Sequence, residues 1–371
     1  MLILGIESSC DDMAAAVVKD GRYILSNVVS SQDEIHKKYG GIVPELASRR
    51  HLETVIPVVE EALNQAKVTL DDIDAIGVTQ GPGLVGSILV GLSFAKAICY
   101  VKDMSFVGVN HITAHPMAVF LEAGSREQGT GNGNDNIRPP IPDPQYPIFP
   151  FIALVVSGGH TTLFKFKDFD NYEILGQTRD DAAGEAFDKV AKLLGLGYPG
   201  GAVIDRLAKS GNVSAIEFTR PYISKDTLDF SFSGIKTAVL NYLKETESHG
   251  SGVSGQGSGF KSKIENRKSK ININDLAASF QEAIVDVLTD KAVSACKANN
   301  IDSLVVSGGV ACNSRLREKM RIKSKDNSIK IFIPEPGLCS DNGAMIAAAA
   351  YHFLKNGIRG GLDMNAIPNM E

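Results

Sequence analysis

LGIESSCDDMAAAVV, residues 4–18, is the stretch that decides the fold of this chain. A short apolar run ends in small polar residues and a second apolar run follows, which predicts a strand, a tight turn and a returning strand. The same order recurs in ALVVSGGHTTLFKF, residues 153–166. A second pair, AIGVTQGPG at 75–83 and SLVVSGGVA at 303–311, predicts in each case a buried strand, a glycine turn and a helix. Because the elements come in the same order in both halves, the sequence predicts an internal duplication.

Two related α/β halves would face each other across a cleft, and such clefts are favoured ligand sites. We expect an N-terminal α/β lobe at residues 1–122 and a C-terminal α/β lobe at 148–371, whose last helix is free to pack back on the first lobe. Residues 123–147 and 246–270 are rich in Gly, Asn, Ser and Pro and lack apolar periodicity. We therefore expect two flexible insert loops there.

The composition is that of a globular protein. The chain has 371 residues, 43% of them hydrophobic and 22% charged, so there is ample apolar surface to bury and whole-chain disorder is excluded. The longest apolar runs, such as 344–350, are far shorter than the ~20 residues that a spanning helix needs, so no membrane segment is expected. Five scattered cysteines without a CxxC pair favour a reducing compartment, and no signal peptide is evident. The expected location is the cytoplasm.

The net charge of −5 means that a role with nucleic acid would have to depend on local basic patches. Six basic residues against one acidic residue lie between positions 315 and 325, and a second basic run lies at 261–270. Such runs are usually solvated faces. They are nevertheless the two stretches of this chain that could follow a phosphate backbone.

Small or glycine-rich turns follow four of the predicted strands, at residues 7–9, 81–83, 157–159 and 307–309. Where Cβ atoms are absent, backbone N–H groups can approach a phosphate, and a following helix N-terminus adds positive potential. One such turn is more often a sharp bend without a ligand, but four at equivalent places favour a nucleotide or a phosphorylated ligand. Neither a P-loop nor a Rossmann glycine motif is present.

His111 and His115, in HITAH, are four residues apart, which on a helix places both imidazoles on one face, able to hold one metal. Satisfied or exposed histidines are the commoner outcome of that spacing. The glutamate of the metalloprotease motif HExxH is missing, because Ile112 follows the first histidine. Asp341, at the predicted start of a helix, is a candidate third ligand, although a plain N-cap is the more frequent role of such an aspartate.

An acidic run in DDAAGEAFDKVAKLL, residues 180–194, places three carboxylates on one helical face. An acidic first turn suits the helix dipole, and that is the simplest explanation. The functional alternative is that Asp188 faces the cleft and accepts hydrogen bonds from a ligand hydroxyl or ammonium group.

Nine motifs, in this order, cover essentially the whole chain except the two predicted loops: GIESSCDD (5–12), GGIVPELASRRH (40–51), QGPGLVGSILVGLSFAK (80–96), VNHITAH (109–115), VVSGGHT (155–161), DDAAGEAFDKVAKLLGLGYPGG (180–201), FSFSGIKTAV (230–239), VSGGVACNSRLR (306–317) and CSDNGAMIA (339–347). Together they resemble the TsaD family of tRNA N6-adenosine threonylcarbamoyltransferases, formerly labelled O-sialoglycoprotein endopeptidases. Nine motifs in order are far more specific than one short pattern.

The resemblance implies a duplicated actin-like or sugar-kinase-like ATPase fold with two related lobes around a cleft. It also implies transfer of the threonylcarbamoyl group from threonylcarbamoyl-adenylate to N6 of the adenosine 3′ of the anticodon, in tRNAs reading codons that begin with A. The metal ligands carried over by motif are His111, His115 and Asp341. The adenylate-binding positions of the family fall on Val155, Val156, Ser157, Gly158, Gly159, Asp188, Gly201, Asp205 and Asn313.

The implied partners are tRNA, a TsaB-like paralogue of similar fold and a small TsaE-like ATPase. One divalent metal is expected, and two imidazoles with one carboxylate lean to Fe(II), with Zn²⁺ possible. The donor is an activated mixed anhydride and adenosine N6 is a weak nucleophile. The chemistry therefore needs positioning, a Lewis acid and charge neutralisation more than a covalent intermediate. Asp11 is the candidate catalytic carboxylate, acting as a base near the reaction.

Three other functions compete with this one. A small-molecule kinase of the same fold class would hold Mg²⁺ on carboxylates, and the histidine pair argues against it. A metalloprotease lacks its glutamate here. A non-catalytic binding scaffold predicts that mutating His111 leaves cellular function intact.

Overall fold

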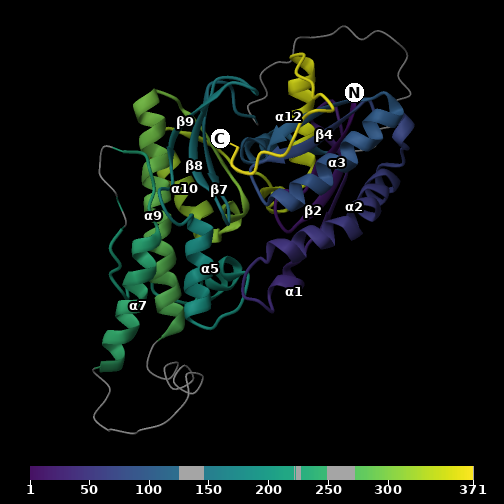
Figure 1. Cartoon of the computed structure of the whole chain (residues 1–371). Helices are drawn as coiled ribbons and strands as arrows, with labels where there is room; N and C mark the ends of the chain where they lie inside the picture. Colours follow the sequence, from purple (N-terminus) through teal and green to yellow (C-terminus); the bar gives the residue numbers. More distant parts are fainter. Residues whose placement is uncertain (125–145, 221, 223–226, 249–271, 371) are drawn as a thin grey trace.

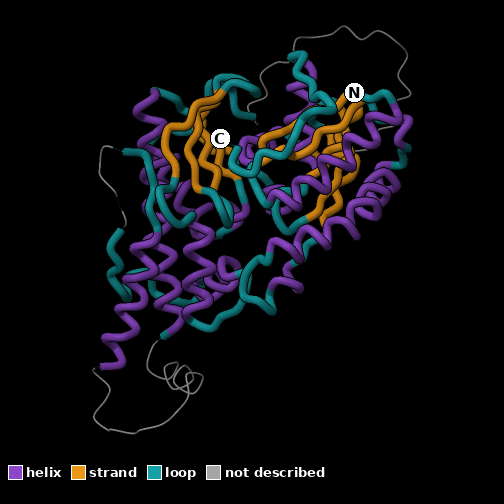
Figure 2. Tube along the Cα trace, in the orientation of Figure 1, coloured by secondary structure: helices purple, strands orange, loops and turns teal. Residues whose placement is uncertain are grey.

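A computed structural model describes residues 1–124, 146–220, 222, 227–248 and 272–370 of the chain (Figures 1 and 2). Most of the two predicted insert loops, 123–147 and 246–270, lies outside the described residues, as does the basic run at 261–270.

The first sheet is built from the N-terminal third of the chain. Its strands are β1 (Leu2–Glu7), β2 (Met13–Lys19), β3 (Tyr23–Ser30), β4 (Ala75–Gly81), β5 (Ser105–Asn110) and β6 (Glu122–Ala123). They lie in the order β5-β4-β1-β2-β3-β6. The meander β1-β2-β3 is antiparallel, whereas β1, β4 and β5 run parallel.

The second sheet repeats this plan. Its strands are β7 (Phe151–Val156), β8 (Thr161–Phe166), β9 (Tyr172–Gln177), β10 (Ser303–Ser307) and β11 (Lys330–Phe332), in the order β11-β10-β7-β8-β9. Here too the meander β7-β8-β9 is antiparallel and β7, β10 and β11 are parallel. β7 therefore takes the place of β1, and β10 the place of β4, as the two sequence comparisons predict. The predicted duplication is confirmed.

Helices cover both sheets. The first half contributes α1 (Asp33–His36), α2 (Pro44–Ala66), η1 (Leu70–Asp72), α3 (Val85–Lys102), α4 (His111–Ala114) and η2 (His115–Phe120). The second contributes α5 (Ala183–Leu193), α6 (Gly200–Ala208), α7 (Ser233–Ser248), α9 (Ile273–Asn299), η3 (Gly309–Cys312), α10 (Ser314–Asp326), α11 (Pro336–Cys339) and α12 (Gly343–Lys355). Apolar residues at helical spacing, Leu52, Val55, Ile56, Val59 and Leu63, predict a helix from His51 to Lys67. The observed helix α2 begins earlier, at Pro44, because proline is well suited to a first helical turn.

Three hydrophobic cores hold these layers together. One lies between the first sheet and the helices α2 and α3, and one between the second sheet and α5, α9 and α10. The third lies between the two sheets, where apolar residues of both halves meet α12 and η2. The last helix of the chain thus packs against β1, β2 and β4 of the first sheet.

The contact between α12 and β1 is unusually close. A Cβ atom on Gly5 would lie 2.1 Å from the carbonyl oxygen of Gly343, and a Cβ atom on Gly343 would lie 2.5 Å from the backbone nitrogen of Ala16. Glycine at both positions therefore lets the helix backbone rest on the sheet, which places the start of α12 beside the strand ends of the first lobe.

Among the described residues, one helix, α3, is long and apolar enough to cross a membrane by length and composition alone, with a mean hydropathy of 1.5. A core helix of a globular protein passes the same test. Leu92, Ala95 and Cys99 of α3 are buried in the core beneath the first sheet.

Candidate active site

Three of the residues singled out in the sequence lie together at the junction of the two halves. His111 opens α4 directly after β5, His115 opens η2, and Asp341 lies between α11 and α12. Each residue offers one atom that could bind a metal, and these three atoms lie within 4.8 Å of one another. Oδ1 of Asp341 is 3.6 Å from Nε2 of His111 and 3.4 Å from Nε2 of His115.

Helix caps hold these side chains in place. The side chain of Asn110 accepts hydrogen bonds from the backbone nitrogens of Ile112 and Thr113, at 2.9 and 3.2 Å, and so fixes the turn that presents His111. The side chain of Asn342 accepts from the backbone nitrogen of Met345 at 2.9 Å and starts α12 directly after Asp341. The predicted N-cap role thus belongs to Asn342, and the carboxylate of Asp341 points to the histidines.

Glu7, which the sequence analysis did not single out, orients His111. It is fully buried at the end of β1, and its Oε2 lies 2.9 Å from Nδ1 of His111. The same carboxylate accepts from the backbone nitrogen of Ser9 at 2.6 Å and from the hydroxyl of Thr79 at 2.7 Å. With Nδ1 held by Glu7, Nε2 of His111 is left to face Asp341, which is the arrangement found around metal-bound histidines.

The charges in this cluster shift one another's proton affinities. Burial lowers the pKa of His111, but the carboxylates of Glu7 and Asp341 outweigh it and raise that pKa to about 9. Burial likewise raises the pKa of Asp341, yet the charges of His111 and His115 hold it well below its usual range. Burial and the two neighbouring histidines lower the pKa of His160 to about 4, so this ring is neutral at pH 7. The two carboxylates therefore favour a positive charge at this place, which a divalent cation would supply.

The cluster suits a metal ion. Nδ1 of His115 is buried without a hydrogen-bond partner among the described residues, and Nε2 has only the carboxylate of Asp341 beside it, at 3.4 Å. A buried ring nitrogen without a partner is costly unless a ligand pairs with it. Two imidazoles and one carboxylate are a donor set typical of Fe(II) and Zn²⁺ sites that keep open coordination positions. The residues present thus fit the expected divalent metal.

A cavity of about 540 Å³ opens beside the cluster and takes its walls from both lobes. Asp11, His111 and Asp341 line it, and so do the glycine turn 157–160 and Asp188 of α5. Across the mouth, Nζ of Lys192 on α5 lies 3.4 Å from the carbonyl oxygen of Gly40 in the first lobe. Burial raises the pKa of Asp11 and also that of Asp188. A carboxyl group with a raised pKa is suited to taking up a proton.

The glycine turn after β7 offers free backbone to this cavity. A Cβ atom added to Gly158 or Gly159 would have no other heavy atom within 4 Å. The N–H of Ser157, in contrast, donates to the carbonyl oxygen of His160 at 2.8 Å. Val155 and Val156 are fully buried and paired within the sheet, so contact with a ligand would have to begin after Val156.

Three of the predicted adenylate-binding residues, Gly201, Asp205 and Asn313, lie outside the lining of this cavity. Oδ1 of Asp205 accepts from the backbone nitrogen and the hydroxyl of Ser314, at 3.1 and 2.8 Å. Asn313 caps α10 and donates to Gln281.

Asp188 connects the cavity to these residues, because it lines the cavity and its Oδ1 also accepts from the backbone nitrogen of Gly200 at 2.7 Å, next to Gly201. Asp188 thus joins α5 to α6, Asp205 joins α6 to α10, and Asn313 joins the start of α10 to α9. The structure therefore divides the predicted residues into a cavity group and a bracing group, with Asp188 in both, and leaves Val155 and Val156 buried in the sheet.

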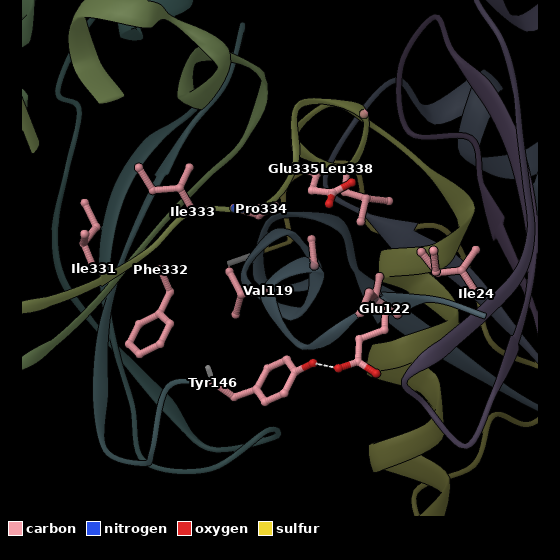
Figure 3. A pocket seen from close by; sticks show the side chains of 14 residues that line it. Ile24, Val119, Glu122, Tyr146, Ile331, Phe332, Ile333, Pro334, Glu335 and Leu338 are labelled. Atoms are coloured by element: carbon pink, nitrogen blue, oxygen red, sulfur yellow. Dashed lines mark hydrogen bonds between the residues drawn. The ribbon is translucent and has the colours of Figure 1, made fainter. Parts of the chain in front are cut away.

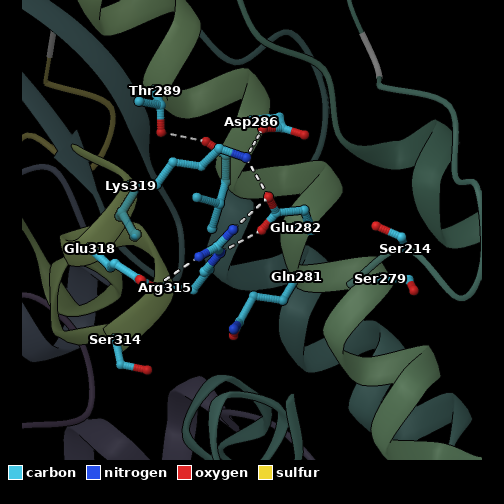
Figure 4. A network of polar contacts seen from close by, with 12 residues as sticks. Ser214, Ser279, Gln281, Glu282, Asp286, Thr289, Ser314, Arg315, Glu318 and Lys319 are labelled. Atoms are coloured by element: carbon cyan, nitrogen blue, oxygen red, sulfur yellow. Dashed lines mark hydrogen bonds and ion pairs between the residues drawn. The ribbon is translucent and has the colours of Figure 1, made fainter. Parts of the chain in front are cut away.

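The basic run at 315–325 forms α10, and much of it is paired. Arg315 pairs with Glu282 at 2.7 Å and with Glu318 at 2.8 Å, while Lys319 contacts Glu282 and Asp286 of α9 (Figure 4). The guanidinium of Arg317 donates to backbone carbonyl oxygens and to the sulfur of Cys339. Ion pairs from Arg315, Lys319 and Lys323, on one face of α10, therefore hold this helix against α9.

A second cavity, of about 650 Å³, lies between β6, η2 and the segment after β11 (Figure 3). Hydrophobic residues such as Ile331, Ile333 and Leu338 contribute to its walls, and the hydroxyl of Tyr146 donates to Glu122 at one side. None of the predicted site residues lines it.

Two related α/β lobes that close over a histidine–carboxylate cluster and a glycine turn define an enzyme of the duplicated ATPase fold class. The TsaD family model, described as tRNA N6-adenosine threonylcarbamoyltransferase, matches residues 23–128 and 139–348, and the chain belongs to this family. The tRNA N6-adenosine threonylcarbamoyltransferase of Clostridium perfringens is 50% identical over 369 residues, which cover 100% of this chain and 97% of that protein. The corresponding protein of Clostridium botulinum is 49% identical with the same coverage.

The fold is also that of a solved structure with little sequence similarity. Full-length HypF is 13% identical, with a TM-score of 0.55, and the match covers 96% of this chain and 46% of HypF. At this identity the likeness concerns the fold alone.

Proposed function

We propose that this chain transfers the threonylcarbamoyl group of threonylcarbamoyl-adenylate to N6 of the adenosine 3′ of the anticodon, in tRNAs reading codons that begin with A, and that it does so in the cleft between its lobes. The observation that carries the proposal is the cluster of His111, His115 and Asp341 beside a cavity of about 540 Å³. Membership of the TsaD family supports the same reaction and does not favour a small-molecule kinase or a metalloprotease.

In this proposal the residues in and beside the cavity have separate roles. His111, His115 and Asp341 hold one divalent metal, which supplies a Lewis acid and charge neutralisation close to the scissile anhydride. The free N–H groups of Gly158 and Gly159 bind the phosphate that leaves as part of the adenylate. Asp11, whose pKa is raised, takes the proton that N6 loses as the new bond forms.

The bracing group shapes the adenosine side of the site. Asp188 holds the turn at Gly200 and Gly201, while Asp205 holds the start of α10 beside Asn313. We assign the adenylate to this side of the cleft, where it would contact these segments directly or through the groups that they position. The valine pair at 155 and 156 contributes through the sheet that carries the glycine turn.

We assign the metal to iron in preference to zinc, because two imidazoles and one carboxylate form the facial donor set typical of Fe(II). We further propose that the chain works in the cytoplasm with tRNA, a TsaB-like paralogue and a TsaE-like ATPase. Its functional division is an N-terminal lobe at 1–122 and a C-terminal lobe at 148–371.

One experiment tests the central assignment. His115→Ala should lose the bound metal and abolish formation of threonylcarbamoyladenosine in tRNA, while the circular dichroism spectrum stays that of the parent. Metal is measured by elemental mass spectrometry and the product by nucleoside mass spectrometry, with the synthase and partner proteins supplied. His352→Ala, which removes a histidine outside the cluster, is the matched control. Unchanged metal content in His115→Ala would falsify the assignment.

A further inference from the structure

Two cysteines from distant parts of the sequence meet beside the candidate active site. Cys312 is the last residue of η3 and Cys339 the last residue of α11. The two thiols lie close enough to shift each other's pKa. Sγ of Cys312 also lies 3.4 Å from the carbonyl oxygen of Pro336, and Sγ of Cys339 lies 3.5 Å from that of Pro334. Both sulfurs are therefore held at one place by the segment that leads into α11.

A single guanidinium group lies against this pair. Nη2 of Arg317 donates to Sγ of Cys339 over 3.1 Å. The same side chain donates to the carbonyl oxygens of Ala311 and Pro334, at 2.6 and 2.8 Å, so the cation is fixed before any reaction begins. This fixed positive charge beside the pair favours the thiolate of Cys312, the reactive form of cysteine.

The two sulfurs differ in their access to solvent. Cys312 is exposed and Cys339 is buried. An oxidant that arrives from solvent therefore reaches Cys312 first and finds Cys339 directly behind it. The hydrogen bond from Cys339 and the charge of Arg317 lower the pKa of Cys312 to about 7, although burial opposes this shift. An accessible thiol with a second thiol in contact is the arrangement expected of a reacting and a resolving cysteine.

We propose that Cys312 and Cys339 form a modification site at which peroxide-class oxidants produce a disulfide bond. The thiolate of Cys312 attacks one peroxide oxygen, the O–O bond breaks, and hydroxide leaves as Cys312 becomes a sulfenic acid. The thiol of Cys339 then attacks the sulfenic sulfur, the S–S bond forms, and water leaves. In total, two thiols and one hydrogen peroxide give one disulfide and two waters. A dithiol reductant reverses the change by thiol–disulfide exchange.

The place of this bond gives it a consequence for the neighbouring site. Cys312 directly precedes Asn313, and Cys339 lies two residues before Asp341. A disulfide would tie the turn that carries Asn313 to the turn that carries Asp341. The chemistry of the pair does not depend on the proposed transferase reaction, so either proposal can fail without the other.

The test is made on the full chain after reduction and removal of the reductant. Treatment with hydrogen peroxide should lower the intact mass by about 2 Da, the mass of two hydrogens removed in forming one disulfide. Peptide mapping should place the bond between Cys312 and Cys339, and dithiothreitol should restore the original mass. Cys99→Ser, which removes a buried cysteine outside the pair, should behave like the parent.

Cys312→Ser and Cys312→Ala are the informative variants, and two are used so that a folding defect in one does not remove the control. Neither should lose about 2 Da under the same treatment. Three results would overturn the proposal. These are a disulfide that maps to another cysteine such as Cys10, the same mass loss in both Cys312 variants, or a folded parent protein that only gains about 16 or 32 Da by oxygen addition.

Discussion

Glu7 sets the direction in which His111 presents its second nitrogen. Because its carboxylate is fixed by Ser9 and Thr79 as well as by His111, it acts as a rigid support and not as a flexible counter-ion. We expect Glu7→Gln to reduce metal affinity by about 10- to 100-fold, the usual effect of removing a carboxylate that supports a histidine ligand. Calorimetric titration of the metal-free protein with Fe(II) or Zn²⁺ measures the change.

A carboxylate elsewhere on the first lobe provides the control for this prediction. Glu53 lies exposed on α2, where it pairs with Arg50, and Glu53→Gln should leave metal affinity within about twofold of the parent, because an exposed pair contributes little. If Glu7→Gln also binds metal as the parent does, Glu7 has no part in orienting His111.

The three metal-site residues could be selected from the sequence for two different reasons. His111 and His115 follow from their spacing, but Asp341 depends on the family resemblance, since an aspartate at a helix start is most often a cap. Glu7 could not be selected at all, because a glutamate at the end of an apolar strand carries no local signal of a partner more than a hundred residues away. Its one hint is its charge, which a fully buried strand end rarely carries without a paired group.

Among the elements, α12 has little tolerance for change where it rests on β1. Gly5→Ala would place a Cβ atom 2.1 Å from the Gly343 oxygen and 2.6 Å from the backbone nitrogen of Ala347, so helix and strand would have to separate. We expect a loss of about 3 kcal/mol or more in the free energy of unfolding, at the upper end of overpacking effects. Urea unfolding followed by circular dichroism measures it.

A glycine with open surroundings is the natural comparison. Gly234 lies in α7, and a Cβ atom there would meet nothing within 4 Å. Gly234→Ala should therefore leave stability unchanged or raise it by up to about 1 kcal/mol, because alanine is the better helix former. Equal stability of Gly5→Ala and Gly234→Ala would mean that α12 can move away from β1 at no cost.

The ion pairs that join α9 to α10 should weaken as the pH falls (Figure 4). Burial raises the pKa of Glu282, but Arg315 and Lys319 outweigh it and lower that pKa from 4.5 to about 2. A lowered pKa in the folded state means that the stabilisation is complete above about pH 4.5 and is lost as pH falls towards 2. We expect Glu282→Gln to unfold about 2–3 kcal/mol more easily at pH 7 and to depend less on pH across this window.

Glu318 is the matched control, because it pairs with the same arginine from an exposed position. Glu318→Gln should change the free energy of unfolding by less than about 1 kcal/mol and keep the acid dependence of the parent. The comparison requires stability measurements between pH 2 and pH 7. A parallel pH profile for Glu282→Gln and the parent would show that the buried pairs do not stabilise this joint.

Most element positions could be predicted from hydrophobic periodicity, but their ends could not. The helix expected from His51 begins at Pro44, because the residues before His51 are mostly polar, so they form a helix without continuing the apolar stripe. The segment from His111 divides into a short α-helix and a 3-10 turn, since Pro116 cannot donate a backbone hydrogen bond. Such ends depend on local hydrogen bonding that an apolar pattern does not report.

At the scale of the whole molecule, the surface of α10 that remains free is where tRNA is expected to bind. Within the basic run at 315–325, Arg317 is not part of this surface, because it bonds to backbone carbonyl oxygens and to Cys339. Arg321 and Lys325 are exposed. Replacing both with Gln should weaken tRNA binding and reduce the slope of log affinity against log salt concentration by about 2, one for each phosphate that is no longer neutralised.

The control removes two positive charges from the other lobe. Lys67 and Lys102 are exposed at the ends of α2 and α3, and the double change to Gln should leave the salt slope as it is in the parent. Filter binding of tRNA at several salt concentrations, in the presence of the partner proteins, provides both slopes. If the two double variants behave alike, tRNA follows another path across the protein.

The duplication, and with it the two-lobed architecture, could be predicted because strand, turn and helix recur in one order. The convergence of Asp341 on the histidines could be expected from the family resemblance but not from a local pattern, because it depends on α11 and α12 leaving the second lobe and returning to the first. The bracing roles of Asp205 and Asn313 have the same origin, since their partners lie in helices far along the chain.

The position of α12 also bears on how the protein is made. One face of the first sheet, with Ile3, Val18 and Val107, is covered by a helix that begins at Gly343. At a synthesis rate of roughly 5–20 residues per second, this face stays exposed on the order of tens of seconds before α12 has been synthesised, while the chain is still attached to the ribosome. Nascent chains stopped short of α12 would expose an apolar sheet surface, which makes the first lobe a substrate for chaperones until translation ends.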